Sequence, residues 1–132
     1  TALLPFLEQT DKGIIVLART SNEGAGEFQD LELKDGSKVY EKVISNVEKE
    51  WNAPNCGLVI GATAPEELKR GRILAPNRFI LIPGVGIQGA TAEDAVVNGI
   101  TEAGDGILIN SSRAIIFASK EADYAEKARE QA

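Results

Sequence analysis

Four short apolar runs, separated by amphipathic stretches, limit the folds open to this chain more than any other feature. The runs are continuous rather than alternating and are rich in β-branched residues, which is typical of strands buried on both faces of a parallel sheet. Strands that alternate with helices predict a parallel sheet with right-handed crossovers. The predicted strands are Gly13–Ala18, Gly57–Gly61, Phe79–Ile82 and Gly106–Ile109.

The stretches between these runs have the spacing of helices. Apolar residues recur every three or four positions on each predicted helix, and Thr63 with Glu66 and Thr91 with Asp94 fit capping-box pairs. Glu23–Gly36 is expected to be irregular, and 115–118 either packs across the bottom of a barrel or forms a short turn. The predicted helices are Thr1–Thr10, Ser37–Trp51, Thr63–Ala75, Thr91–Glu102 and Ser119–Ala132.

Two architectures accommodate four βα units. One is a free-standing, flavodoxin-like sheet, and the other is half of an eight-unit (β/α)8 barrel, which typically needs about 250 residues. The first residues, Thr1–Leu7, look like the end of a helix, and the chain has no Met. Both features favour a half barrel cut from a longer protein, with removal of an initiator Met as the alternative. The expected organisation is one domain, or part of one, over residues 1–132.

Composition excludes several classes of function. A net charge of −6 and a pI near 4.7 argue against a nucleic-acid surface, and the apolar runs are too short to span a bilayer. The chain has no His, so a Ser-His-Asp triad and a histidine-based zinc site are impossible within it. Cys56 is the single cysteine, which favours a reducing, cytoplasmic setting.

A glycine-rich loop follows the third predicted strand. Pro83 ends the apolar run, and Gly84, Gly86 and Gly89 allow the backbone to bend before a helix begins near Thr91. A strand, a glycine loop and a helix N-terminus in this order suit phosphate binding. The same glycine pattern also fits an ordinary βα turn, so both interpretations remain open.

Donor-rich segments follow all four predicted strands, where parallel sheets bind ligands. Arg113 carries a fork that matches phosphate oxygens, although a surface salt bridge is the alternative, and Ser21 is either a ligand contact or a polar cap. Glu23 and Asp30 are the carboxylates nearest these ends, and neither follows a strand directly. Proton transfer is therefore expected from residues outside this chain. The segments are 19–22, 61–63, 83–88 and 110–113.

Four motifs in this order resemble orotidine 5′-phosphate decarboxylase of the bacterial subfamily. They are Leu-Ala-Arg-Thr-Ser-Asn at 17–22, Gly-Leu-Val-Ile-Gly-Ala-Thr at 57–63, Leu-Ile-Pro-Gly-Val-Gly-Ile-Gln-Gly at 81–89 and Gly-Ile-Leu-Ile-Asn-Ser-Ser-Arg-Ala at 106–114. The resemblance implies a (β/α)8 TIM barrel, of which this chain supplies about strands 5–8. It also implies conversion of orotidine 5′-phosphate to uridine 5′-phosphate and carbon dioxide, in pyrimidine biosynthesis.

The same resemblance implies roles for particular residues. Ser21 contacts the pyrimidine ring, Pro83 lies beside it, and Gln88 and Arg113 hold the 5′-phosphate. The family's catalytic Asp-x-Lys-x-x-Asp cluster does not occur here and is expected on the other half of the barrel, so no catalytic residue is assigned to this chain. The implied enzyme uses no metal or cofactor and is a homodimer. The full implied substrate-binding set is Ser21, Pro83, Gly84, Gln88, Ser112 and Arg113.

Two other functions remain open on the sequence. One is another phosphate-binding barrel enzyme, such as a pentulose-phosphate decarboxylase or an indole-forming synthase, although the Thr-Ser-Asn and Asn-Ser-Ser-Arg contexts fit these less well. The other is a nucleotide-phosphate binding module without catalysis.

Overall fold

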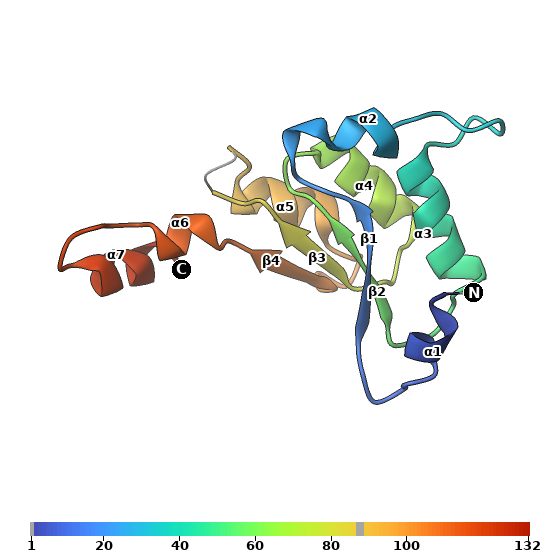
Figure 1. Ribbon diagram of the computed structural model, residues 1–132, viewed down its shortest axis with the longest axis horizontal. Helices are drawn as coiled ribbons and strands as arrows, with labels where there is room; N and C mark the ends of the chain where they lie inside the picture. Colours follow the sequence, from blue (N-terminus) through green and yellow to red (C-terminus); the bar gives the residue numbers. More distant parts are fainter. Residues whose placement is uncertain (1, 87–88) are drawn as a thin grey trace.

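The chain forms a single four-stranded sheet in which every neighbouring pair of strands is parallel (Figure 1). The structure, a computed structural model, describes residues 2–86 and 89–132. The strand order β1-β2-β3-β4 follows the chain, so the predicted order and direction of the strands are confirmed. The strands are β1 (Ile14–Arg19), β2 (Cys56–Ile60), β3 (Ile80–Pro83) and β4 (Ile107–Asn110).

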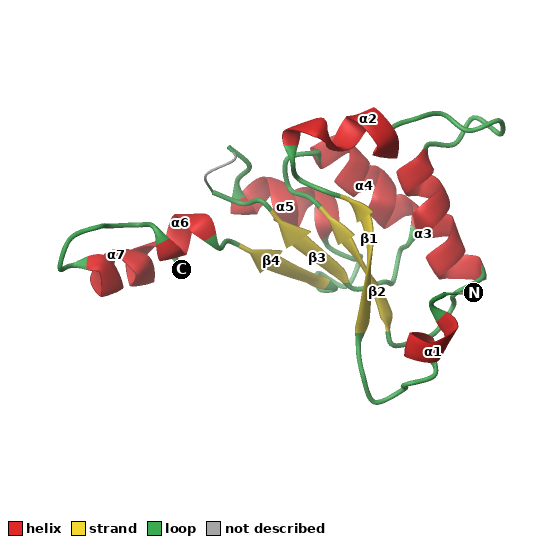
Figure 2. Cartoon of the chain, viewed as in Figure 1, coloured by secondary structure: helices red, strands yellow, loops and turns green. Residues whose placement is uncertain are grey.

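Three long helices join successive strands and lie on one face of the sheet (Figure 2). They are α3 (Val39–Lys49), α4 (Pro65–Leu74) and α5 (Ala92–Gly99). Right-handed crossovers between adjacent strands, taken in chain order, place every connecting helix on the same face. A flavodoxin-like sheet changes its strand order and carries helices on both faces. The fold is therefore that of half a (β/α)8 barrel.

The core lies between the sheet and these helices. Leu58, Ile60 and Ile82 are completely buried, and they pack with Ile44 of α3 and Leu68 of α4. Burying side chains of this size contributes about 1.5–3 kcal/mol each. The core therefore fixes which face of each strand meets the helices.

The opposite face of the sheet is apolar but uncovered. Side chains alternate between the two faces of a strand, so the residues next to the helix-facing ones point the other way. Ile15 is 43% exposed, and Leu17 and Leu108 are each 54% exposed. Val59 of β2 and Leu81 of β3 are half-buried and alternate with the helix-facing residues, so this apolar face extends from β1 to β4.

Several short elements differ from the sequence prediction. The stretch predicted as irregular contains η1 (Glu23–Ala25) and α2 (Gly26–Gln29). Its glycines disfavour helix locally, but burial of Ala25 and an ion pair of Asp30 with Arg19 outweigh that preference. The segment 115–118 lies partly in a short helix. The remaining elements are α1 (Leu4–Leu7), α6 (Arg113–Ile116) and α7 (Tyr124–Gln131).

One predicted helix cap is confirmed and another is wrong. At α5 the backbone N–H of Asp94 donates to Thr91 Oγ1 at 3.0 Å, as the sequence predicts. At α4 the N-cap residue is Ala64, and no side chain caps the helix. Thr63 Oγ1 instead donates to the carbonyl oxygen of Ser21 at 3.0 Å. The Thr63 hydroxyl, which the sequence pattern predicts to cap α4, therefore makes a tertiary contact with Ser21 instead.

Two arginines tie the amino ends of the strands together. Arg72 donates to the carbonyl oxygens of Gly99 (2.6 Å), Arg78 (2.7 Å) and Gly106 (3.1 Å). Arg78 pairs with Glu48 at 2.5 Å and donates to the carbonyls of Ala53 and Cys56. Each guanidinium thereby satisfies backbone acceptors that come from several elements.

The strands β1 and β2 approach closely where they end. The N–H of Gly61 donates to the carbonyl of Arg19 at 2.8 Å. A Cβ atom at position 61 would lie 2.7 Å from the backbone N of Ser21 and 2.8 Å from its Cα. Only a residue without a side chain fits there unless the Ser21 backbone moves.

We expect Gly61→Ala to destabilise the protein by about 1–3 kcal/mol, the usual cost of overpacking. Gly13→Ala is the matched control, because a Cβ at position 13 would meet nothing within 4 Å. Urea denaturation of both variants, made in a protein that contains the complete barrel, checks the difference. Equal stability of the two variants would show that the Ser21 backbone yields without cost.

A carboxylate supports the N-terminus of α3. Glu41 Oε2 accepts from the backbone N–H of Lys38 at 2.8 Å, and Glu41 Oε1 accepts from Arg70 Nε at 2.6 Å. The hydrogen bond from Arg70, then the one from the Lys38 backbone, lowers the pKa of Glu41 from its ordinary value of 4.5. The folded state therefore prefers the ionised carboxylate, which stabilises the fold fully above that value.

We expect Glu41→Gln to cost about 1 kcal/mol of stability at pH 7, as for the loss of a helix cap. The difference from the unmodified protein should shrink as the pH falls below 4.5 and Glu41 becomes protonated in both states. Urea midpoints at pH 7 and pH 3 measure it. Glu102→Gln, at an exposed position, is the control. A difference that is the same at both pH values would rule out the ionised carboxylate as its source.

Candidate functional site

A small hollow at the carboxyl ends of the strands brings together most of the predicted binding residues. It measures about 180 Å³ and contains Ser21, Pro83, Gly84, Ser112 and Arg113. The sixth predicted residue, Gln88, lies outside the described residues. The remaining lining residues are Val85, Asn110 and Ala114. The predicted binding set names none of these three residues, although the donor-rich segments 83–88 and 110–113 include Val85 and Asn110. Ala114 is small and apolar and has no chemical signal of its own.

The loops that follow β3 and β4 form one wall of this hollow. Ser111 Oγ donates to the carbonyl of Val85 at 3.1 Å, which links the two loops. Gly86 has a φ of +98°, and a Cβ there would lie 2.9 Å from the Cβ of Ala114. Glycine at position 86 is therefore required both by its backbone conformation and by the close approach of the β4 loop.

Arg113 offers the positive charge of the hollow. It is the first residue of α6 and is exposed. Among the described residues, no carboxylate pairs with it, so the salt bridge considered as its alternative role is not formed there. A guanidinium in this state can donate two parallel hydrogen bonds to a phosphate or carboxylate.

A second hollow, of about 420 Å³, adjoins the first at Ser21. It is lined by Arg19, Asn22, Glu23, Thr63 and Ala64 as well as Ser21. Sites for small molecules usually measure roughly 300–1,000 Å³, so the first hollow alone takes only part of a nucleotide-sized ligand. Ser21 stands between the two spaces and can contact a ligand that occupies both.

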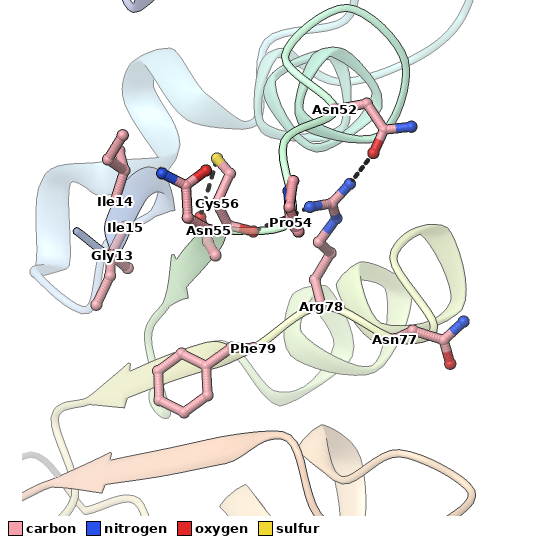
Figure 3. A pocket seen from close by; sticks show the side chains of 11 residues that line it. Gly13, Ile14, Ile15, Asn52, Pro54, Asn55, Cys56, Asn77, Arg78 and Phe79 are labelled. Atoms are coloured by element: carbon pink, nitrogen blue, oxygen red, sulfur yellow. Dashed lines mark hydrogen bonds between the residues drawn. The ribbon is translucent and has the colours of Figure 1, made fainter. Parts of the chain in front are cut away.

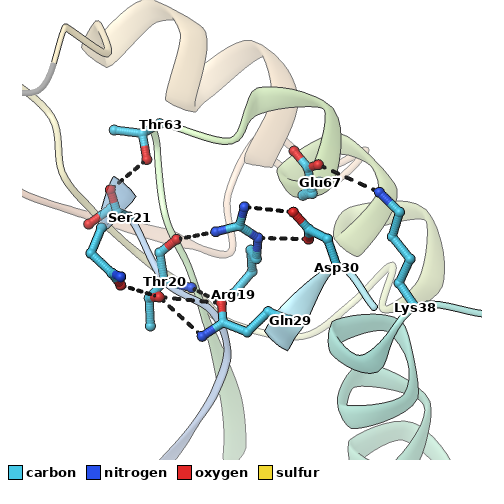
Figure 4. A network of polar contacts seen from close by, with 9 residues as sticks. Arg19, Thr20, Ser21, Gln29, Asp30, Lys38, Thr63 and Glu67 are labelled. Carbon is cyan, nitrogen blue, oxygen red and sulfur yellow. Dashed lines mark hydrogen bonds and ion pairs between the residues drawn. The ribbon is translucent and has the colours of Figure 1, made fainter. Parts of the chain in front are cut away.

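Two charged groups near Ser21, Arg19 and Asp30, already pair with each other. Arg19 Nε and Nη2 donate to the two carboxylate oxygens of Asp30 at 3.0 and 2.9 Å (Figure 4). Neither group is therefore available as an acid, a base or an anion site. Glu23 is exposed at the edge of the second hollow, and within the described residues no lysine lines either space. The site has binding groups but lacks an evident proton donor.

A larger cavity, of about 630 Å³, opens at the opposite ends of the strands (Figure 3). Its walls include Ile15, Phe79 and Arg78, but the Arg78 guanidinium is bonded to Glu48, Asn52 and backbone carbonyls. In parallel α/β folds, ligands bind at the carboxyl ends of the strands, and the amino ends serve stability. The smaller hollow at Ser21 and Arg113 is therefore the better candidate, despite its size.

The described part of the chain offers no metal centre, since no three His, Cys, Asp or Glu side chains within it are grouped to hold an ion. Within residues 2–86 and 89–132, no helix combines the length and the apolar surface that crossing a membrane requires.

Comparison with known proteins shows which family this chain is similar to. The family model described as orotidine 5′-phosphate decarboxylase / HUMPS family matches residues 1–128. Orotidine 5′-phosphate decarboxylase of Azoarcus sp. (strain BH72) is 49% identical over 126 residues, which cover 95% of this chain and 46% of the relative. The enzyme of the same name from Haloarcula marismortui is 50% identical over 123 residues, covering 92% of this chain and 43% of that one.

Solved structures show the same fold. The structure of Leishmania donovani OMP decarboxylase superposes with a TM-score of 0.80 at 38% identity, over 97% of this chain and 48% of that one. Leishmania donovani UMP synthase gives a TM-score of 0.84 at 39% identity, over 98% and 28%. The chain spans less than half the length of the curated relatives described here. With a family model that matches nearly every residue, the chain belongs to the orotidine 5′-phosphate decarboxylase / HUMPS family.

Proposed function

We propose that this chain forms the phosphate- and pyrimidine-binding half of an orotidine 5′-phosphate decarboxylase. The enzyme converts orotidine 5′-phosphate to uridine 5′-phosphate and carbon dioxide, as the names of the relatives imply for those proteins. The observation that carries the proposal is the convergence of Ser21, Pro83 and Arg113 on one hollow, in a chain of this family.

The hollow suggests how the substrate lies. Arg113, which pairs with no described carboxylate, receives the 5′-phosphate beside the loop that begins at Gly84. Ser21, at the other wall, contacts the pyrimidine ring where the second hollow begins. Phosphate binding far from the reacting carbon supplies binding energy that the enzyme can use in the transition state. This half then contributes to catalysis without supplying the catalytic acid.

The proton must come from residues outside this chain. A lysine protonates the ring carbon as carbon dioxide leaves, and neighbouring aspartates position that lysine. Their expected place is the amino-terminal half of the same (β/α)8 domain, of which residues 1–132 form the carboxyl-terminal half. The length of the relatives supports this, since the match covers less than half of each. The reaction as proposed needs no cofactor.

The uncovered face of the sheet also supports the amino-terminal half of the barrel as the partner of this chain. Ile15, Leu17 and Leu108 form an apolar surface on the side away from the helices. The outer strands β1 and β4 each leave one edge without a partner strand in the described part of the chain. A second set of four βα units would cover both edges and the face. We propose further that two such barrels form a homodimer and that the enzyme works in the cytoplasm.

We expect the 132-residue chain, expressed alone, to associate with itself or to be insoluble, because its open face and edges are apolar and unpaired. Sedimentation velocity measures the association. Leu17→Lys should reduce it, because the substitution places a charge on the open face. Val97→Lys, on α5 where Val97 is 77% exposed, is the control and should leave it unchanged. If the chain alone were a monodisperse monomer that melts cooperatively, the proposal that it requires the other half of a barrel would be wrong.

We expect Arg113→Ala, in the protein that also contains the amino-terminal half, to reduce kcat/KM for orotidine 5′-phosphate by about tenfold to more than a hundredfold. Losing a hydrogen bond to a charged group costs about 1.5–3 kcal/mol. Steady-state kinetics measure the loss. With orotidine, which lacks the phosphate, the same substitution should change the rate little.

Arg129→Ala removes an exposed arginine from α7 and is the matched control, expected to behave like the unmodified enzyme. If Arg113→Ala slowed both substrates equally, Arg113 would be a structural residue. A full-length protein that binds uridine 5′-phosphate but releases no carbon dioxide would instead favour a binding module without catalysis.

A further inference from the structure

The position of Ser21 is set by its neighbours rather than by its own side chain. Its hydroxyl makes no hydrogen bond to any described residue, which leaves it available to a ligand. Its carbonyl oxygen accepts from Thr63 Oγ1 at 3.0 Å. Gly61 lies against its backbone so closely that no Cβ fits between them. One side of the Ser21 peptide is thus held by the loop that follows β2.

The other side is held by the segment that follows β1. Arg19 donates to both oxygens of Asp30, and its Nη1 donates to the carbonyl of Thr20 at 2.8 Å. The N–H of Thr20 donates to Gln29 Oε1, also at 2.8 Å. The N–H and the carbonyl of Thr20, the residue before Ser21, are therefore both bonded to side chains (Figure 4).

The ion pair is well suited to this task. The side chains of Arg19 and Asp30 are only 11% and 25% exposed, and their two hydrogen bonds are parallel. A partly buried, bidentate pair is more rigid than an exposed one, since it has two bonds to break and little water to replace them. Asp30 follows directly after α2, so the short helix between β1 and α3 serves to place this carboxylate.

We propose that Thr63 and the Arg19–Asp30 pair are positioning residues that fix the Ser21 peptide, so that its free hydroxyl meets the pyrimidine end of the substrate. The inference rests on the proposed function. A group held in place before the substrate arrives loses no conformational freedom on binding, and small misplacements near the reacting atoms are costly. The phosphate end of the site, at Arg113, is built from other elements and does not depend on these contacts.

The test uses the full-length enzyme with Thr63→Val, which keeps the shape of the side chain but removes its hydroxyl. We expect kcat/KM for orotidine 5′-phosphate to fall about threefold to tenfold, the effect of one hydrogen bond. Thr63→Ser, which keeps the hydroxyl, should restore most of the activity. Inhibition by ribose 5-phosphate, which reports on the phosphate end, should be the same in all three proteins.

A double-mutant cycle separates positioning from general stability. An enzyme with Ser21→Ala has no hydroxyl at position 21 to position. Adding Thr63→Val to it should therefore reduce kcat/KM almost no further. If Thr63→Val reduced kcat/KM by the same factor with Ser21 and with Ala at position 21, Thr63 would not act through Ser21, and the inference would be overturned. Asp30→Asn is the second variant, should Thr63→Val fail to fold, and the same cycle applies to it.

Amide hydrogen exchange over residues 20–22, measured without substrate, tests the positioning of Ser21 independently of the proposed decarboxylase function. Exchange there should rise in Thr63→Val and not in Thr63→Ser, whichever reaction the enzyme performs. An unmodified enzyme that does not decarboxylate orotidine 5′-phosphate refutes the proposed function, and the exchange result still decides whether Thr63 holds Ser21. An active enzyme with unchanged exchange and unchanged kcat/KM in Thr63→Val refutes the positioning inference alone.

Discussion

Burial of the sheet on one face is the constraint on which the rest of this structure depends. Each strand turns alternate side chains toward α3, α4 and α5, and these side chains form the core. Adjacent parallel strands joined by right-handed crossovers can bury only this face with their own helices. The parallel direction of the strands in turn determines where the site lies. All four strands end at the same rim, and residues as distant in sequence as Ser21 and Arg113 meet there.

Charged groups at this rim fall into two sets. Arg19 and Asp30 satisfy each other, so their charges are used to hold the backbone. Arg113 pairs with no carboxylate in the described part of the chain, and the Ser21 hydroxyl is likewise unbonded there. A side chain without an internal hydrogen-bond partner breaks no existing bond when it binds a ligand, so its binding costs less free energy. It also separates the residues that shape the site from those that touch a substrate.

The sequence predicted the four strands, their order and five of the residues in the hollow, because buried strands and strand-end motifs are local signals. The sixth, Gln88, lies outside the described residues. Two features could not be read locally. The helical turns of η1 and α2 depend on Ala25 and Asp30 contacting distant parts of the chain. Thr63 matched a helix cap in sequence, yet a carbonyl 42 positions away competes better for its hydroxyl. Both errors arise where tertiary contacts override local preference.

The arginines at the amino ends give the two rims of the sheet different tolerance to mutation. Arg72 and Arg78 hold backbone carbonyls from neighbouring elements, and they lie at the rim opposite Ser21 and Arg113. Changes at the arginine rim alter how much folded protein accumulates, whereas changes to the unpaired groups of Ser21 and Arg113 alter ligand binding. Gly61 is the exception at that second rim, because it packs against the Ser21 backbone. Divergence toward new substrates can therefore proceed at one rim while the other preserves foldability. The two stabilising arginines and the groups that face the hollow thus lie at opposite ends of the same strands.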